Sequence, residues 1–154
     1  MIRLGAAMVL ALAACQPVPT QQSSSPVAPK QVVAQQGQMG ALLNSQRSAQ
    51  GLGPLVEDAA LSRSACAHAQ DMVTNGYFAN QGLNGSTFVQ RARGAGYTCA
   101  AAENLAEGQR TEAAVVTAWM NSSGHRRNIL LREATEFGIG RVDNMWVLVL
   151  GRGC

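Results

Sequence analysis

The sequence has few aromatic residues, no large excess of charge and no long apolar run. The last two absences each exclude a class of protein. Phe, Trp and Tyr make up 5% of its 154 residues. The net charge is +3, and the basic residues are scattered apart from one local group at Arg126, Arg127 and Arg132. The sequence therefore predicts no nucleic-acid partner. The longest apolar run, from Leu4 to Ala14, has about half of the roughly 20 residues that a membrane-spanning helix needs.

This short apolar run has the features of an export signal. Arg3 precedes it, small residues end it, and Leu12-Ala13-Ala14-Cys15 resembles a bacterial lipobox. We therefore expect residues 1–14 to be a lipoprotein-type signal peptide and Cys15 to carry the acyl chains that hold the exported protein to a membrane. Ordinary secretion after an Ala-x-Ala cleavage site is the alternative. With Gln16 rather than Asp after the cysteine, we expect the outer membrane if the envelope is Gram-negative, although the membrane face is left open.

The segment 15–37 differs in composition from the rest of the chain. It contains four of the five prolines together with many Gln and Ser residues, and it shows no apolar periodicity. Such a segment buries too little apolar surface to offset the entropy lost on ordering, so we expect a disordered tether. Residues 38–154 then form one domain, which is long enough for a single hydrophobic core.

The remaining sequence alternates between helical and strand periodicity. Strands are expected at about 99–107, 135–142 and 145–151, and the last one is apolar on both faces, so we expect it to be covered on both sides. The fold class is therefore α+β. Helices are expected at Met39–Gln50, from an Asp58 cap to Asn75, after a Ser86 cap and after a Thr111 cap.

Seven segments occur in an order typical of one known family. They are ALLNSQRSAQGLGPL at 41–55, AHAQDM at 67–72, GYFAN at 76–80, AENLA at 102–106, AWMNSSGHRRNIL at 118–130, TEFGIG at 135–140 and MWVLVLG at 145–151. Together they resemble the bacterial form of the CAP superfamily (SCP-like; cysteine-rich secretory, antigen 5 and pathogenesis-related proteins). The resemblance implies a three-layer α-β-α sandwich with a small central antiparallel sheet.

The resemblance also implies a polar cleft with one departure from the family pattern. The family's cleft usually contains two His and two Glu, and the matching positions here are Asn80, Glu103, His125 and Glu136. One imidazole is thus replaced by the Asn80 amide, which is a poor zinc ligand. We expect no cofactor, with His125, Glu103 and Glu136 as weak candidates for a divalent metal such as zinc. His68, in the helical pattern, is expected to be structural.

The expected function is binding, through this degenerate cleft, of a lipid-like, peptide or glycan ligand of the bacterial cell envelope. No Gly-x-Ser-x-Gly motif is present, so catalysis is the less favoured interpretation. One alternative is a weak hydrolase or protease with Glu103 or Glu136 as base and His125 as acid. Another is a structural or host-interaction domain without a small ligand. The sequence names no ligand, and the protein is expected to be a monomer.

Three cysteines remain after Cys15. In the fold that the resemblance implies, the strands that end near Cys99 and Cys154 belong to one sheet, so we expect these two residues to form a disulfide. Closing a loop of this length stabilises a domain by about 4 kcal/mol in the chain-entropy model. Cys66 would then be a buried or half-exposed thiol, or itself bridged; the sequence does not decide between the two.

Overall fold

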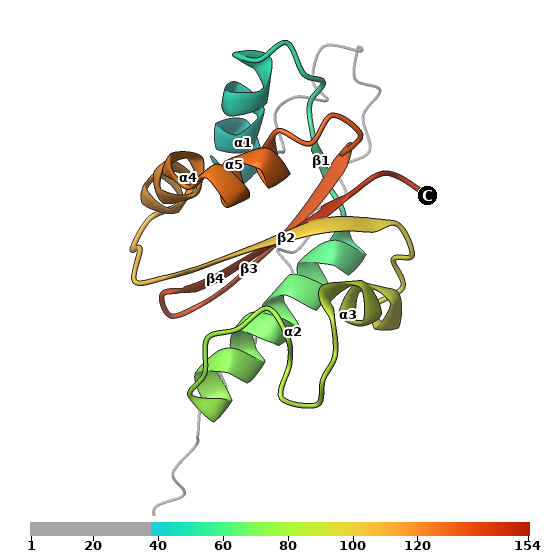
Figure 1. The fold of residues 1–154 in the computed structure, drawn as a ribbon, viewed down its shortest axis with the longest axis vertical. Coiled ribbons are helices and arrows are strands. Elements are labelled where there is room, and N and C mark those ends of the chain that lie inside the picture. Colours follow the sequence, from blue (N-terminus) through green and yellow to red (C-terminus); the bar gives the residue numbers. More distant parts are fainter. Residues whose placement is uncertain (1–37) are drawn as a thin grey trace, which may run out of the picture.

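The computed structural model describes residues 38–154 and shows a sheet covered by helices on both faces (Figure 1). The expected signal peptide, Cys15 and the tether lie outside the described residues. Helices α2 and α3 cover one face of the sheet, and α1, α4 and α5 cover the other. In chain order the elements are α1 Gln38–Ser48, β1 Val56–Glu57, α2 Ala59–Asn75, α3 Phe88–Gly94, β2 Ala100–Glu107, α4 Glu112–Asn121, α5 Ser123–Ile129, β3 Glu136–Val142 and β4 Met145–Gly151.

The sheet has four strands in the order β1-β3-β4-β2. The three long strands pair antiparallel and lie within a residue of the ranges expected from the sequence. The short strand β1, which has no strand pattern of its own, pairs parallel with β3. The expected sandwich is confirmed, with the correction that its sheet is mixed rather than wholly antiparallel.

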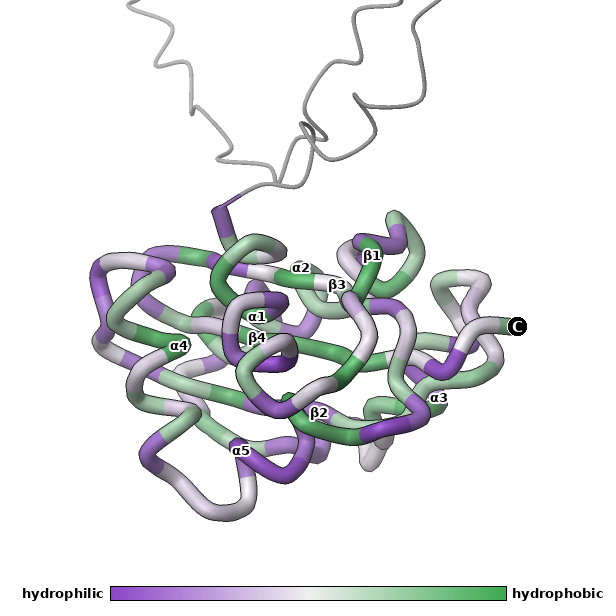
Figure 2. Tube along the Cα trace, turned by 90° about the horizontal axis from the view of Figure 1, so that it is seen from above, coloured by the Kyte–Doolittle hydropathy of each residue, from purple (hydrophilic) through white to green (hydrophobic). Residues whose placement is uncertain are grey.

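Strand β4 lies at the centre of two cores. Its odd-numbered residues Met145, Val147 and Val149 pack with α2, and its even-numbered residues pack with α1, α4 and α5. Every residue of β4 is buried, as its doubly apolar pattern predicts. Figure 2 shows the same contrast, because β4 is largely hydrophobic inside the domain whereas α5 is largely hydrophilic.

The two glycines of the TEFGIG segment permit the close approach of α2 to the sheet. A Cβ atom on Gly138 would lie 2.1 Å from the carbonyl carbon of Leu61, and one on Gly140 would lie 2.3 Å from that of Ala65. Any larger residue would push the helix away from β3. These glycines therefore fix the distance between the layer that contains α2 and the sheet.

The helix boundaries confirm two of the expected caps and correct a third. The Asp58 side chain accepts from Leu61 N and the Thr111 side chain accepts from Ala114 N, as predicted. The cap of α3 is Thr87 rather than Ser86, because Thr87 and Gln90 form a capping box. Helix α5 was not expected, since the Gly124 region has the composition of a turn.

The Cys99–Cys154 disulfide is present, with a Cα–Cα distance of 5.8 Å, and this prediction is confirmed. It joins the residue before β2 to the end of the chain. No cysteine within residues 38–154 is free, so Cys66 in α2 is not a free thiol. Within the same residues, no helix has both the length and the apolar character that crossing a membrane requires.

Candidate functional site

Glu103 lies on strand β2 at the edge of the sheet, and its side chain is only 2% exposed. Alternation along β2 directs Glu103 toward the face covered by α2 and α3, whereas Asn104 points to the opposite face. A buried carboxylate requires hydrogen-bond partners or an ion pair, because an isolated buried charge is costly. The partners of Glu103 therefore decide what this site can do.

Arg91 of α3 is the main partner of Glu103. Its Nη2 lies 2.7 Å from Glu103 Oε1, and the Asn80 Nδ2 donates to Oε2 at 3.1 Å. Arg91 also donates to the backbone oxygens of Ser86 and Asn80. Both carboxylate oxygens are thus engaged, and the guanidinium ties the loop after α2 to the sheet.

Helix α5 is held against the free edge of β2 by two asparagines. Asn104 Nδ2 donates to the backbone oxygen of His125 at 3.0 Å. Asn128 Nδ2 donates to Asn104 Oδ1 at 2.8 Å and to the Glu103 backbone oxygen at 3.2 Å. The bond to Glu103 satisfies a backbone oxygen of β2, and the three bonds together bring the His125 backbone close to this strand.

The His125 imidazole, in contrast, takes no part in this network. Among residues 38–154 its ring forms no hydrogen bond and no ion pair, although its backbone oxygen is bonded to Asn104. Partial burial lowers its pKa below the ordinary histidine value, and no carboxylate contributes to the shift. The ring is therefore neutral at pH 7 and has no acidic partner to raise its basicity.

Glu136 belongs to a separate pair. At the start of β3 its carboxylate accepts a hydrogen bond from the Tyr97 hydroxyl, which in turn accepts from Gly153 N at 3.1 Å. Burial, followed by this bond to Glu136, raises the pKa of Tyr97 to about 12. Within the described part of the chain, Glu136 forms no hydrogen bond with Asn80, Glu103 or His125. The structure thus joins Asn80 to Glu103 but not the four residues to one another.

These pairings do not fit a metal ion. Residues 38–154 contain no group of three or more His, Cys, Asp and Glu side chains placed to hold one. Of the candidate ligands, Glu103 faces a guanidinium and Glu136 faces a phenol. A cation beside Arg91 would also be repelled, since the two positive charges would compete for one carboxylate.

A cavity of about 690 Å³ lies beside the Arg91 network. Residues of α2, the loop residues Leu83, Asn84 and Ser86, and Arg91 itself line it. His68, on the α2 wall, is 1% exposed and donates from Nε2 to the Ala79 backbone oxygen, in accord with the structural role expected for it. Burial lowers the pKa of His68, so this ring is neutral as well. The cavity gives a ligand access to Arg91, whose side chain is 13% exposed.

Sequence reasoning missed several residues of the site. Asn104 and Asn128 lie within the AENLA and GHRRNIL segments, so the motifs themselves contained a signal for them. Arg91 and Tyr97 lie between motifs, and only the folded chain brings them to Glu103 and Glu136. No spacing rule along the chain predicts those contacts.

The fold and the motifs define the class of protein. The model of the CAP family, described as the cysteine-rich secretory protein family, matches residues 41–147, and the chain belongs to this family. The uncharacterized protein YkwD of Bacillus subtilis is 44% identical over 119 residues, which are 76% of this chain and 46% of YkwD. The chain therefore spans less than half the length of this curated relative.

Solved structures agree with this assignment. An extracellular protein containing an SCP domain from Bacillus anthracis has a TM-score of 0.72 and 30% identity, covering 75% of this chain and 39% of that one. An outer surface protein from Borrelia burgdorferi has a TM-score of 0.68 and 24% identity, covering 75% of this chain and 90% of that one. At that identity the second likeness shows the fold alone.

Proposed function

We propose that this CAP-domain protein is exported and binds an envelope ligand without transforming it. The ligand is lipid-like, a peptide or a glycan, and it binds beside Asn80, Glu103, His125 and Glu136. One observation supports binding over catalysis: Glu103 is occupied by Arg91 and Asn80. A general base must lie within hydrogen-bond reach of the proton that it removes, and a carboxylate that is 2% exposed and already accepts from a guanidinium and an amide gives a substrate little access.

The alternative of a weak hydrolase has less support. It requires Glu103 or Glu136 to act as base while His125 acts as acid. The His125 ring has no carboxylate partner within the described residues, and its pKa is lowered rather than raised. A ring that is neutral at pH 7 is a poor proton donor, so His125 lacks the protonated form that a general acid requires. A structural or host-interaction domain remains the outcome if no ligand is found.

Export is supported by the disulfide and by a relative. The Cys99–Cys154 bond is typical of an oxidising compartment, and the related structure from B. anthracis is named an extracellular protein. We propose in addition that acyl chains on Cys15 anchor the protein to a membrane, with residues 15–37 as the tether and the outer membrane as the site in a Gram-negative envelope. This anchor lies outside the described residues.

Native mass spectrometry of the protein recovered from its own envelope tests the binding proposal. A Cys15→Ser chain avoids the heterogeneous lipid mass. We expect an added mass that is reduced at least tenfold in occupancy by Glu103→Gln or His125→Ala. Glu133→Gln, which removes an exposed carboxylate elsewhere, serves as the control and should retain the ligand.

Three other results would contradict the binding proposal. A bare protein mass in the Cys15→Ser chain without a further substitution would favour the structural or host-interaction alternative. An added mass that survives both cleft variants would place the ligand elsewhere on the domain. Turnover of envelope peptides or glycans that Glu103→Gln abolishes would establish the hydrolase.

A further inference from the structure

A second cavity, of about 570 Å³, lies beyond the far end of β2 and has no assigned role. This volume is within the range of about 300–1,000 Å³ that is typical of ligand pockets. The end of α2, the end of β2 and the β3–β4 hairpin line it, and none of Asn80, Glu103, His125 and Glu136 does. It is therefore separate from the Asn80–Glu103 pair and from the cavity beside Arg91.

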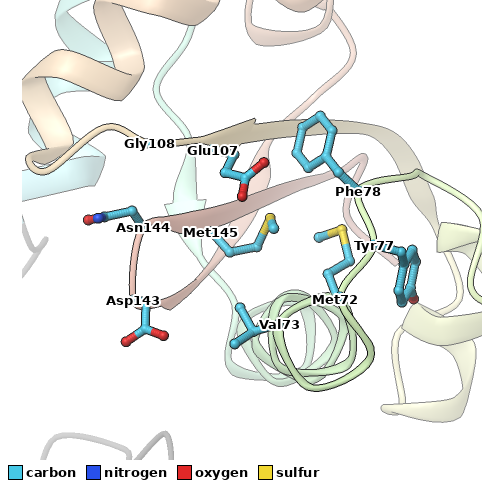
Figure 3. A pocket seen from close by; sticks show the side chains of 10 residues that line it. Met72, Val73, Tyr77, Phe78, Glu107, Gly108, Asp143, Asn144 and Met145 are labelled. Atoms are coloured by element: carbon cyan, nitrogen blue, oxygen red, sulfur yellow. The ribbon is translucent and has the colours of Figure 1, made fainter.

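The floor of this cavity is apolar and adaptable. Met72, Met145 and Val73 form it, with Met72 and Met145 closely packed at 0% and 5% exposure, and the Phe78 ring, which is 51% exposed, stands at one side. Methionine side chains are flexible and polarisable, so a floor built from two of them accommodates varied apolar shapes. Figure 3 shows the Glu107 carboxylate between the Phe78 ring and the Met145 side chain, with Asp143 at the outer end on the hairpin.

The rim of the cavity is negative, because its two carboxylates have no partner in the described part of the chain. Arg141 lies beside the hairpin, but its guanidinium donates to the backbone oxygens of Asp143 and Arg110 and to Asn144 Oδ1 rather than to a carboxylate. Six of the nine acidic side chains have a hydrogen-bond or ion-pair partner among residues 38–154. Glu107 and Asp143, which both line this cavity, are two of the three that have none, the third being Glu112. No Lys or Arg lines the cavity, although the chain has 12 such residues and a net charge of +3.

The end of α2 adds to the negative potential. This helix of 17 residues ends at Asn75, has no basic residue in its last turn, and its final turn and Gly76 form one wall. The C-terminus of a helix carries a partial negative charge that favours cations. Two unpaired carboxylates and a helix end thus surround an apolar floor.

We infer that this cavity binds a primary alkylammonium group, with the aliphatic stem over Met72 and Met145 and the ammonium near Glu107 and Asp143. The lysine side chain of a peptide and a free aliphatic amine share this chemistry. The site is independent of the cleft around Glu103, so the two proposals fail separately.

Methyl NMR of the Cys15→Ser chain labelled at the methionine methyl groups tests this inference. Met72 and Met145 report on the cavity, and Met39 and Met120, which pack on the other face of the sheet, are internal controls. Titration with n-hexylammonium should shift only the first pair of signals. The probe n-hexanol, which has the same stem without the charge, should bind at least fivefold more weakly.

Variants then locate the charge recognition. Glu107→Gln combined with Asp143→Asn should weaken n-hexylammonium about fivefold, since exposed ion pairs contribute little each, and added salt should weaken it in the wild type. Glu133→Gln, which removes one carboxylate charge at a distant site, should alter binding less than twofold. Phe78→Ala should weaken the ammonium and the alcohol alike.

A blocked Gly-Lys-Gly peptide distinguishes the two sources of the ammonium group. Binding of this peptide tighter than n-hexylammonium assigns a peptide lysine, and the reverse order assigns a free amine. Either order supports the inference if Met72 and Met145 shift. Equal binding of n-hexanol, unchanged binding in the double variant, or no shift of the two methyl signals would overturn it.

Discussion

Replacing Arg47 by methionine is expected to cost the domain at least about 4 kcal/mol of its free energy of unfolding. The Arg47 side chain is 1% exposed and donates to four backbone oxygens at 2.7 to 2.9 Å: those of Gly53, Ile129, Leu131 and Ala134. A hydrogen bond to a charged group contributes about 1.5–3 kcal/mol, and methionine would remove this donor from all four carbonyls, of which that of Leu131 still accepts from Ala134 N. The loss is large compared with the roughly 5–15 kcal/mol of a whole domain.

Arg47 also positions part of the candidate site, because three of the backbone oxygens to which it donates lie between His125 and Glu136. The guanidinium connects α1 to the segment from Ile129 to Ala134, and so fixes the chain between α5 and β3. Arg47→Lys should recover little, since an ammonium cannot reproduce a planar fork that reaches several carbonyls at once.

Urea denaturation followed by circular dichroism measures these losses. Arg132→Met is the control, because that side chain is exposed, and its stability should change by less than about 0.5 kcal/mol. If Arg47→Met does not fold at all, Arg47→Lys still gives a measurable loss. A loss below about 1.5 kcal/mol in Arg47→Met would contradict the role assigned to this residue.

Arg91→Met is expected to destabilise the domain by about 3 kcal/mol. The variant leaves the Glu103 carboxylate, whose side chain is 2% exposed, without its cation and with only the Asn80 amide as donor. Removing one partner of a buried ion pair costs about 3–5 kcal/mol, because the other charge remains buried. We expect the lower end of this range, since Asn80 still compensates in part.

A double-mutant cycle separates this pair from its surroundings. Arg91→Met combined with Glu103→Gln should recover at least half of the loss, because the neutral amide needs no cation. Arg93→Met, an exposed position two residues further along, is the matched control. If the double variant is as unstable as the two losses added together, Arg91 and Glu103 are not coupled as described.

The sequence predicted the fold well where the pattern is local. Neighbouring residues alone predict the doubly apolar strand β4 and the caps Asp58 and Thr111. The order of the family segments along the chain then predicts how the elements are arranged. Strand β1 was missed because two residues carry no periodicity, and its pairing depends on β3. Helix α5 was missed because Gly124 favours a turn, whereas the bonds from Asn104 and Asn128 hold the segment against β2.

The candidate site could be predicted only as a set of positions. Asn80 and Glu103 do meet, as their carried-over positions suggest. Which charges pair is a tertiary property, however, and the partners Arg91 and Tyr97 belong to elements that no motif connects to Glu103 or Glu136. The replacement of a family histidine by Asn80 was visible in the sequence, but the arginine that occupies Glu103 was not.

NMR titration of the His125 ring, in the wild type and in Glu103→Gln, tests most directly whether Glu103 is paired with Arg91 rather than with His125. Burial lowers the His125 pKa below its ordinary value of about 6.5 without help from a carboxylate. We therefore predict a pKa below that value, unchanged by Glu103→Gln. A wild-type pKa above about 6.5 that falls by about one unit in Glu103→Gln would show an acid–base pair and would contradict the binding function proposed here.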